Sequence, residues 1–378
     1  MNRQTLFLLS LLFILSACLQ KNKKNFSAPL VLADSWAIAE PNKEGLNVPA
    51  LEKLISAVSD ENPKINSLTI ARHGKLIVDE YFNGYSPDSL HKIWSITKVI
   101  SSTLIGIAAN QGLLSEKDSI YAYFPNYIQD KNSSKGHITI EHLLSMTSGL
   151  EWIELGGPKS SGFQLAYSSD WIAFVLDQPH TNVAGKVFNY SSGNSMLLAP
   201  IIKKACKVQA NEYAQKHLFT PLNITNYEWD KQSEFWTKTQ NGELPGAKPP
   251  GHIHYQKPFA YLTNTGSGLR MRSRDLCKLG QLYLNQGKWN GKQIVSQKWI
   301  KQSTQTLHNN SYYGYHWQGI SLNNHHGYCA SGFGLQKIFV FPKFDLVVVM
   351  TQQHYQTMPE GEKWTKQFLI ELLETIDN

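Results

Sequence analysis

The residues that favour β-strands gather near both ends of the chain, and this separation constrains the fold most. The β-rich runs cover residues 68–82, 337–341 and 346–350. Helical patterns cover residues 141–146, 171–176, 196–204, 273–284 and 364–376, and a further helix is expected after Ser95. We therefore predict an α+β fold: an antiparallel β-sheet, built from hairpins at the two ends and flanked by helices, beside a mostly helical lobe.

The first residues have the pattern of a bacterial lipoprotein signal. A basic opening precedes an apolar run at residues 6–15 that is too short to span a bilayer comfortably, and Leu15-Ser16-Ala17-Cys18 resembles a cleavage site. The resemblance implies that Cys18 carries a lipid. An ordinary secretory signal with a chance cysteine is the alternative. Because Leu19 carries no acidic retention signal, we expect anchoring in the outer membrane of the cell envelope, facing the periplasm.

Composition is consistent with one sizeable domain behind this signal. Of the 378 residues 42% are hydrophobic, and the net charge of +7 comes from scattered residues, so we expect no nucleic-acid partner. We expect a signal peptide at 1–17, a tether at 18–40 and one catalytic domain at 41–378. Its sheet lobe would cover about 41–95 and 270–378, and its helical lobe about 96–269.

A serine and a lysine three residues apart stand before the apolar run 99–109. If a helix begins there, Ser95 and Lys98 lie on one face, and the lysine amine can reach the serine hydroxyl. A serine needs an adjacent base to act as a nucleophile, and a buried lysine can provide one. The spacing alone is weak evidence, because it recurs at Ser89 and Lys92 in an expected solvated loop.

Five blocks in a fixed order strengthen this interpretation. They are Trp94-Ser95-Ile96-Thr97-Lys98, residues 138–150, Phe188-Asn189-Tyr190-Ser191-Ser192-Gly193, Gly268-Leu269-Arg270-Met271, and residues 330–336. Together they resemble the serine β-lactamase-related family, in its class C and esterase branch. That family includes β-lactamases, D-alanyl-D-alanine peptidases and esterases, and its site lies between a sheet lobe and a helical lobe. The resemblance implies a small ester, amide or peptide-like substrate and no cofactor.

The resemblance also implies roles for individual residues. Ser95 would attack a carbonyl to form an acyl-enzyme, and Lys98 and Tyr190 would handle protons, with either one as the acylation base. The backbone N–H groups of Ser95 and Phe333 would bind the oxyanion. Ser331-Gly332 would position Phe333, although these residues could equally serve only a hairpin turn.

Two departures from the family pattern bear on the substrate. Ser192, expected to face the substrate, stands where the family often has Asn, and Ala330 stands where it often has Lys or His. Without that cation, a substrate carboxylate has no obvious partner, unless the register shifts to His326-Gly327. We therefore favour an ester or amide hydrolase with an aromatic-lined cleft over a β-lactamase or carboxypeptidase. An inactive penicillin-recognising lipoprotein is a further alternative.

Other motifs indicate less. His252-x-His254 and His325-His326 lack the His-Glu-x-x-His pattern of a zinc site, so we expect no metal. The segment Thr265-Gly266-Ser267-Gly268 lacks the lysine of a phosphate-binding loop and is expected to form a turn. Asp79-Glu80 is expected to be solvated.

Overall fold

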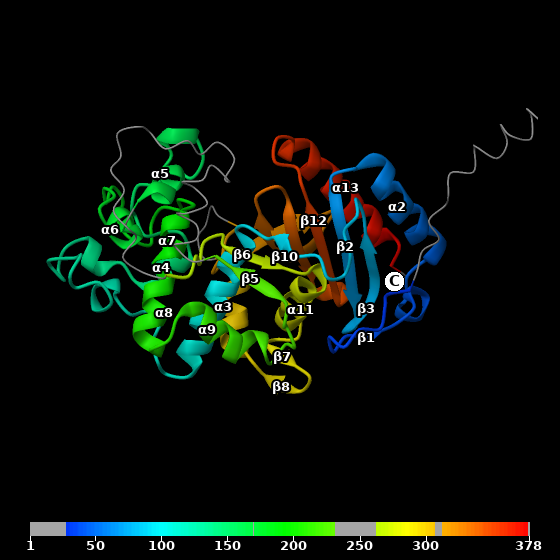
Figure 1. Cartoon of the computed structure of the whole chain (residues 1–378), viewed down its shortest axis with the longest axis horizontal. Helices are drawn as coiled ribbons and strands as arrows, with labels where there is room; N and C mark the ends of the chain where they lie inside the picture. The colour runs from blue at the N-terminus through cyan, green and yellow to red at the C-terminus, as the bar shows by residue number, and fades with distance from the viewer. Residues whose placement is uncertain (1–27, 169, 231–261, 307–311, 377–378) are drawn as a thin grey trace, which may run out of the picture.

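The computed structural model describes residues 28–168, 170–230, 262–306 and 312–376 (Figure 1). Its strands are β1 Ala37–Ile38, β2 Ile65–Arg72, β3 Lys75–Tyr81, β4 His91–Lys92, β5 Tyr227–Trp229, β6 Leu269–Met271, β7 Lys288–Trp289, β8 Lys292–Gln293, β9 Gln318–Leu322, β10 His325–Gly332, β11 Gln336–Phe341 and β12 Leu346–Gln352. Its α-helices are α2 Val48–Glu61, α3 Ile96–Asn110, α4 Ile140–Leu144, α5 Ser161–Tyr167, α6 Trp171–Leu176, α7 Ser192–Met196, α8 Leu198–Cys206, α9 Ala210–Ala214, α11 Ser273–Leu284, α12 Gln297–Thr304 and α13 Met358–Glu374.

A seven-stranded sheet joins the two ends of the chain. Its strand order is β1-β3-β2-β12-β11-β10-β9, and every pair is antiparallel except β1 with β3. The central strand is β12, and Met350 of β12 lies opposite Leu68 of β2. The predicted fold is therefore confirmed, with one short parallel pair at an edge. A smaller sheet of β4, β6 and β5 lies beside it.

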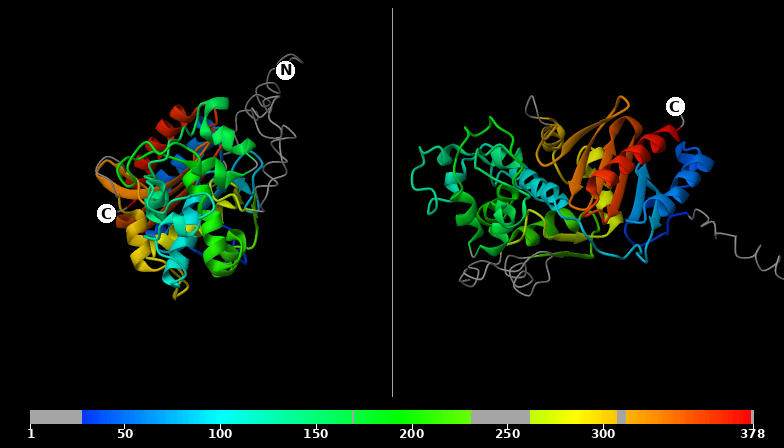
Figure 2. Two further views of the ribbon diagram at one scale, coloured as in Figure 1. Left: turned by 90° about the vertical axis from the view of Figure 1, so that its left-hand side faces the viewer. Right: turned by 90° about the horizontal axis from the view of Figure 1, so that it is seen from above.

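The large sheet is covered on both faces. Alternate residues of β11 and β12 enter two different apolar clusters: Ile338 and Val347 pack on the side of α11, whereas Phe339 and Val348 pack on the side of α13. Helices α2 and α13 lie together on this second side, at the end of the molecule opposite the helical region α4 to α8 (Figures 1 and 2). Burial on both faces explains why β12 is a nearly continuous apolar run.

The helices expected from the sequence are present, although several differ in their bounds. Helix α13 begins at Met358, before the expected start at Trp364. Helix α11 covers 273–284 as expected, with Arg272 as its N-cap residue and no side-chain hydrogen bond at the cap. The Ser273 hydroxyl instead lies 2.6 Å from the Thr69 hydroxyl of β2, which ties the helix to the sheet.

The folded domain begins before residue 41. Asp34 is buried, and its carboxylate accepts a hydrogen bond from Arg274 at 2.6 Å. Arg274 also bonds Asp79 at 2.8 Å. The Asp79 side chain is 1% exposed rather than solvated, and burial raises the pKa of its carboxyl. The last part of the expected 18–40 tether is thus packed against the domain, and Cys18 lies outside the described residues. The division at 95 and 270 into two lobes stays a prediction.

Within the described part of the chain, no helix combines the length and the apolar character needed to cross a membrane.

The loop expected around His91 contains the short strand β4, and His91 is buried. Its ring stacks on Tyr85, with 4.8 Å between ring centroids, and burial lowers the pKa of His91 from 6.5 to about 4. As pH falls below 6.5, the unfolded chain takes up a proton that the folded chain refuses, so stability falls until about pH 4.

We expect this one histidine to cost up to about 3 kcal/mol of stability at the acid end. The measurement is urea unfolding at pH 7 and pH 4.5 for the wild type and His91→Phe. The variant should lose less stability on acidification. An equal loss in both proteins would contradict the prediction.

Candidate active site

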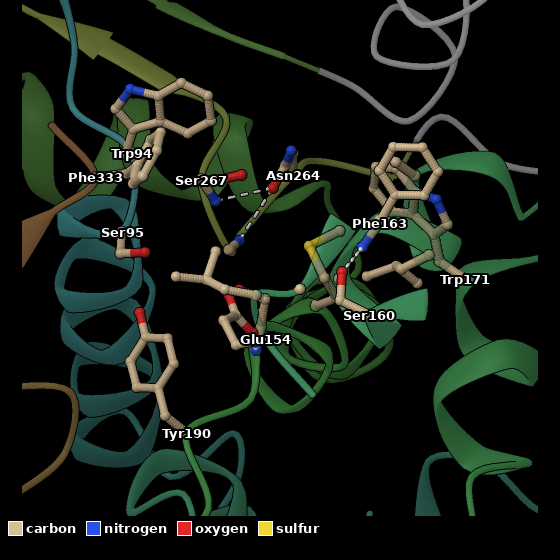
Figure 3. Close-up of a pocket in the computed structure, with 18 of the residues that line it drawn as sticks. Trp94, Ser95, Glu154, Ser160, Phe163, Trp171, Tyr190, Asn264, Ser267 and Phe333 are labelled. Carbon is tan, nitrogen blue, oxygen red and sulfur yellow. Dashed lines mark hydrogen bonds between the residues drawn. The ribbon is translucent and has the colours of Figure 1, made fainter. Parts of the chain in front are cut away.

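Ser95 occupies the N-cap position of α3, yet its hydroxyl does not cap the helix. Lys98 Nζ lies 3.0 Å from Ser95 Oγ instead, as the spacing predicts. The preceding residue, Trp94, has a left-handed φ of 48°, which turns the chain sharply into the helix. Strained backbone of this kind is concentrated at functional sites. The turn leaves the Ser95 hydroxyl facing the cavity rather than the helix end (Figure 3).

Lys98 is almost fully buried, with 1% of its surface exposed. Its Nζ atom lies 3.0 Å from Ser95 Oγ, 3.0 Å from Ser192 Oγ and 2.8 Å from the carbonyl oxygen of Gly266. Asn264 holds Gly266 in place, because its Oδ1 accepts the N–H of Gly266 at 3.1 Å. The expected turn at residues 265–268 is therefore confirmed, and it also contributes a backbone carbonyl to the site.

Tyr190 lies just before α7 and faces the same cavity. The Nζ atom of Lys98 is 5.1 Å from the centroid of the Tyr190 ring. Figure 3 shows the Tyr190 hydroxyl pointing toward Ser95. The edge of a second aromatic ring, that of Tyr313, packs against it at 6.2 Å. The structure thus brings together Ser95, Lys98 and Tyr190 from three separate sequence blocks.

Glu154 is a site residue that sequence reasoning missed. Its carboxylate accepts the backbone N–H of Ser192 at 2.8 Å and the hydroxyl of Ser192, and it accepts Trp152 Nε1–H at 2.6 Å. The residue stands in an irregular stretch after the 138–150 block, where no helical or strand period marks it. No signal in the sequence pointed to this carboxylate.

A cavity of about 420 Å³ opens beside Ser95. The apolar side chains that line it are Trp94, Leu155, Phe163, Leu165, Ala166, Trp171, Met196 and Phe333. Among the described residues of this lining there is no Lys, Arg or His, and Glu154 is the one carboxylate. The expected aromatic-lined cleft is present. It suits an apolar group of a substrate better than a negatively charged one.

The block at residues 330–336 reaches the cavity only at Phe333. Strand β10 ends at Gly332, and the described hydrogen bonds leave the backbone N–H groups of Phe333 and Ser95 without an acceptor. Ser331 and Gly332 are not among the described lining residues, and Ala330 is buried in the core. His326 stands near the other end of β10. At the rise of a β-strand, it lies about 20 Å from Gly332, where the strand ends beside Phe333.

A buried histidine lies close behind the site. His316 is 3% exposed, and its Nε2 atom lies 3.4 Å from Ser195 Oγ. Burial holds the pKa of His316 well below its usual value, so the ring is neutral. Among the described residues, no group of three or more His, Cys, Asp or Glu side chains could hold a metal ion. His252 and His254 lie outside the described residues.

The sheet, the helical region and the serine–lysine pair at the start of α3 have the arrangement of the β-lactamase fold. The sequence pattern of the beta-lactamase family matches residues 66–371, and the chain belongs to that family.

Individual relatives are distant. Protein flp of Staphylococcus aureus (strain COL) is 26% identical over 218 residues, which are 54% of this chain and 43% of flp. The chain thus matches less than half the length of that relative. A putative 6-aminohexanoate-dimer hydrolase from Bacillus anthracis superposes with a TM-score of 0.65 at 20% identity, covering 86% of this chain and 83% of the other. EstCE1, a hydrolase with promiscuous acyltransferase activity, superposes with a TM-score of 0.64 at 14% identity. The match covers 87% of this chain and 97% of EstCE1. These likenesses show the fold.

Proposed function

We propose that the protein hydrolyses small neutral esters or amides through an acyl-enzyme on Ser95. The observation that carries the proposal is the position of the Ser95 hydroxyl, which does not cap α3, lies 3.0 Å from the buried Lys98 amine and faces Tyr190. This arrangement gives a serine nucleophile a base and a second proton-handling group, without a histidine.

The reaction would proceed in two halves. Ser95 Oγ bonds to the substrate carbonyl carbon while its proton passes to Lys98, and the unpartnered N–H groups of Ser95 and Phe333 receive the negative oxygen. The carbonyl re-forms as the leaving group departs with a proton from Tyr190. Tyr190 then takes up a proton from Lys98. Water then attacks the ester on Ser95, and the same groups return the serine to its starting state.

The cavity supports a neutral substrate with an apolar acyl group. A β-lactam or a peptide C-terminus carries a carboxylate, and the described lining offers no cation to pair with it. Glu154 would repel such a charge. These features favour an esterase or amidase over a β-lactamase or a D-alanyl-D-alanine peptidase. The approach of Lys98 to both the Ser95 hydroxyl and the Tyr190 ring favours an active enzyme over a binding protein without catalysis.

Intact-mass spectrometry tests the acyl-enzyme directly. We expect the protein to gain the mass of one phosphonyl group from a fluorophosphonate and one acyl group from an activated butyrate ester, both on Ser95. Benzylpenicillin should react much more slowly than either probe. Absence of an adduct with all three probes would overturn the proposal, and preferential acylation by benzylpenicillin would overturn its substrate class.

We also propose that the protein is anchored to the cell envelope by a lipid on Cys18, on the strength of the sequence at residues 1–18. Radiolabelled palmitate supplied to expressing cells should enter the wild type, and the protein should sediment with membranes. The Cys18→Ser variant should remain unlabelled. Equal labelling of both proteins would contradict the anchor.

A further inference from the structure

We propose that Glu154 is a positioning residue, which acts through the Ser192 hydroxyl to orient Lys98 and to stabilise the charge that Lys98 gains during acylation. The inference rests on the proposed acyl-enzyme function and deepens it. It assigns a task to the carboxylate that stands in the cavity wall beside Ser192.

The first argument is the direction of the hydrogen bonds. A serine hydroxyl has one proton to donate. The Ser192 hydroxyl lies between the Glu154 carboxylate, which can only accept, and Lys98 Nζ at 3.0 Å. Ser192 therefore donates to Glu154 and turns a lone pair toward Lys98. The carboxylate thus fixes the Ser192 hydroxyl as an acceptor for the lysine amine.

The second argument is charge. Lys98 is 1% exposed, and its three hydrogen-bond partners, the oxygens of Ser95, Ser192 and Gly266, are all uncharged. A buried ammonium without a counter-charge is costly. When Lys98 takes the proton of Ser95, the Glu154 carboxylate lies one hydroxyl group away. Its negative charge lowers the energy of the state in which Lys98 is protonated.

The third argument is that Glu154 is itself held in place. Trp152 Nε1 donates to its carboxylate at 2.6 Å, and the backbone N–H of Ser192 donates at 2.8 Å. Trp152 is buried and packs over Gly193, where an added Cβ atom would lie 2.6 Å from the indole ring. Close packing at this glycine holds the indole, and the indole holds the carboxylate.

Ser192 also explains why a carboxylate is needed here. An asparagine at this position could turn its amide oxygen toward Lys98, and hydrogen bonds from its NH2 group could hold the amide in that orientation. The shorter serine hydroxyl rotates freely unless a strong acceptor fixes its proton. Glu154 is that acceptor.

A double-mutant cycle tests the inference, with the rate of fluorophosphonate labelling of Ser95 as the readout. We expect Glu154→Gln to lower the maximal labelling rate by about 10- to 100-fold, with little change in the probe concentration that gives half the maximal rate. Ser192→Ala should cause a similar loss. The double variant should be no slower than the slower single variant, because the two residues act through one path.

Two further variants separate positioning from general structural damage. Trp152→Phe removes one of the hydrogen bonds that hold Glu154 but leaves those with Ser192, so its labelling rate should fall, by less than that of Glu154→Gln. In a Ser192→Asn background, Glu154→Gln should lose most of its effect. If Glu154→Gln lowers the labelling rate by the same factor in the Ser192→Ala or Ser192→Asn background as in the wild type, the inference is overturned.

The same experiment distinguishes this inference from the proposed function. If the wild type is labelled on Ser95 but the effects of Glu154→Gln and Ser192→Ala simply multiply, the acyl-enzyme proposal stands and the positioning role falls. If the wild type is not labelled at all, both fall.

Discussion

Replacing Ser95 by alanine is expected to reduce the turnover of a neutral ester by about 10⁴-fold or more and to abolish covalent labelling. The variant lacks the oxygen to which the acyl group would bond. The fold should remain, because the Ser95 hydroxyl makes no cap bond to α3 and its one described hydrogen-bond partner is Lys98. We expect the free energy of unfolding to change by less than about 1 kcal/mol. Initial-rate assays and urea unfolding provide the two measurements.

The chain supplies a matched control for this substitution. Ser89 begins the second Ser-x-x-Lys match, but its hydroxyl accepts the N–H of Ser86 at 2.9 Å in an exposed turn before β4. Ser89→Ala should therefore keep full turnover and labelling. If Ser95→Ala keeps more than a hundredth of the wild-type rate, or is still labelled, Ser95 is not the nucleophile.

The parts of the site that the sequence predicted depend on local patterns. The apolar run after Ser95 forms α3, and a helix brings residues three positions apart onto one face, so the contact between Ser95 and Lys98 follows from spacing. The hairpin of β2 and β3 likewise follows from alternating β-rich residues around His73-Gly74. The position of Tyr190 near Lys98 does not follow from spacing, and only the family resemblance predicted it.

The parts that the sequence did not predict depend on contacts between distant segments. The carbonyl oxygen of Gly266 accepts a hydrogen bond from Lys98, which is 168 positions away in the sequence. The Glu154 carboxylate accepts one from Ser192, which is 38 positions away. No periodic pattern marks either partner. Asp79 was expected to be solvated because charged residues usually are, but Arg274 lies beside it once α11 packs on the sheet. A buried ion pair of this kind is visible only after the fold is assembled.

The close approach of β10 to the chain before Ser95 gives a second prediction with a large effect. An added Cβ atom at Gly332 would lie 2.3 Å from the carbonyl oxygen of Ile93. To relieve that overlap, either the strand end that carries Phe333 or the segment that carries Ser95 must move. Because the proposed oxyanion site is formed between the N–H groups of these two residues, we expect Gly332→Ala to lower the maximal rate by about 10²-fold or more.

A second glycine of the same strand separates this effect from simple loss of stability. An added Cβ atom at Gly327 would lie 2.4 Å from the carbonyl oxygen of Val340, an overlap of the same kind at a place far from Ser95. Both alanine variants should lose about 1–3 kcal/mol of stability in urea unfolding. Only Gly332→Ala should also lose activity when both are assayed under conditions where they are folded. If Gly327→Ala loses as much activity, or Gly332→Ala loses none, the oxyanion is not bound between Ser95 and Phe333.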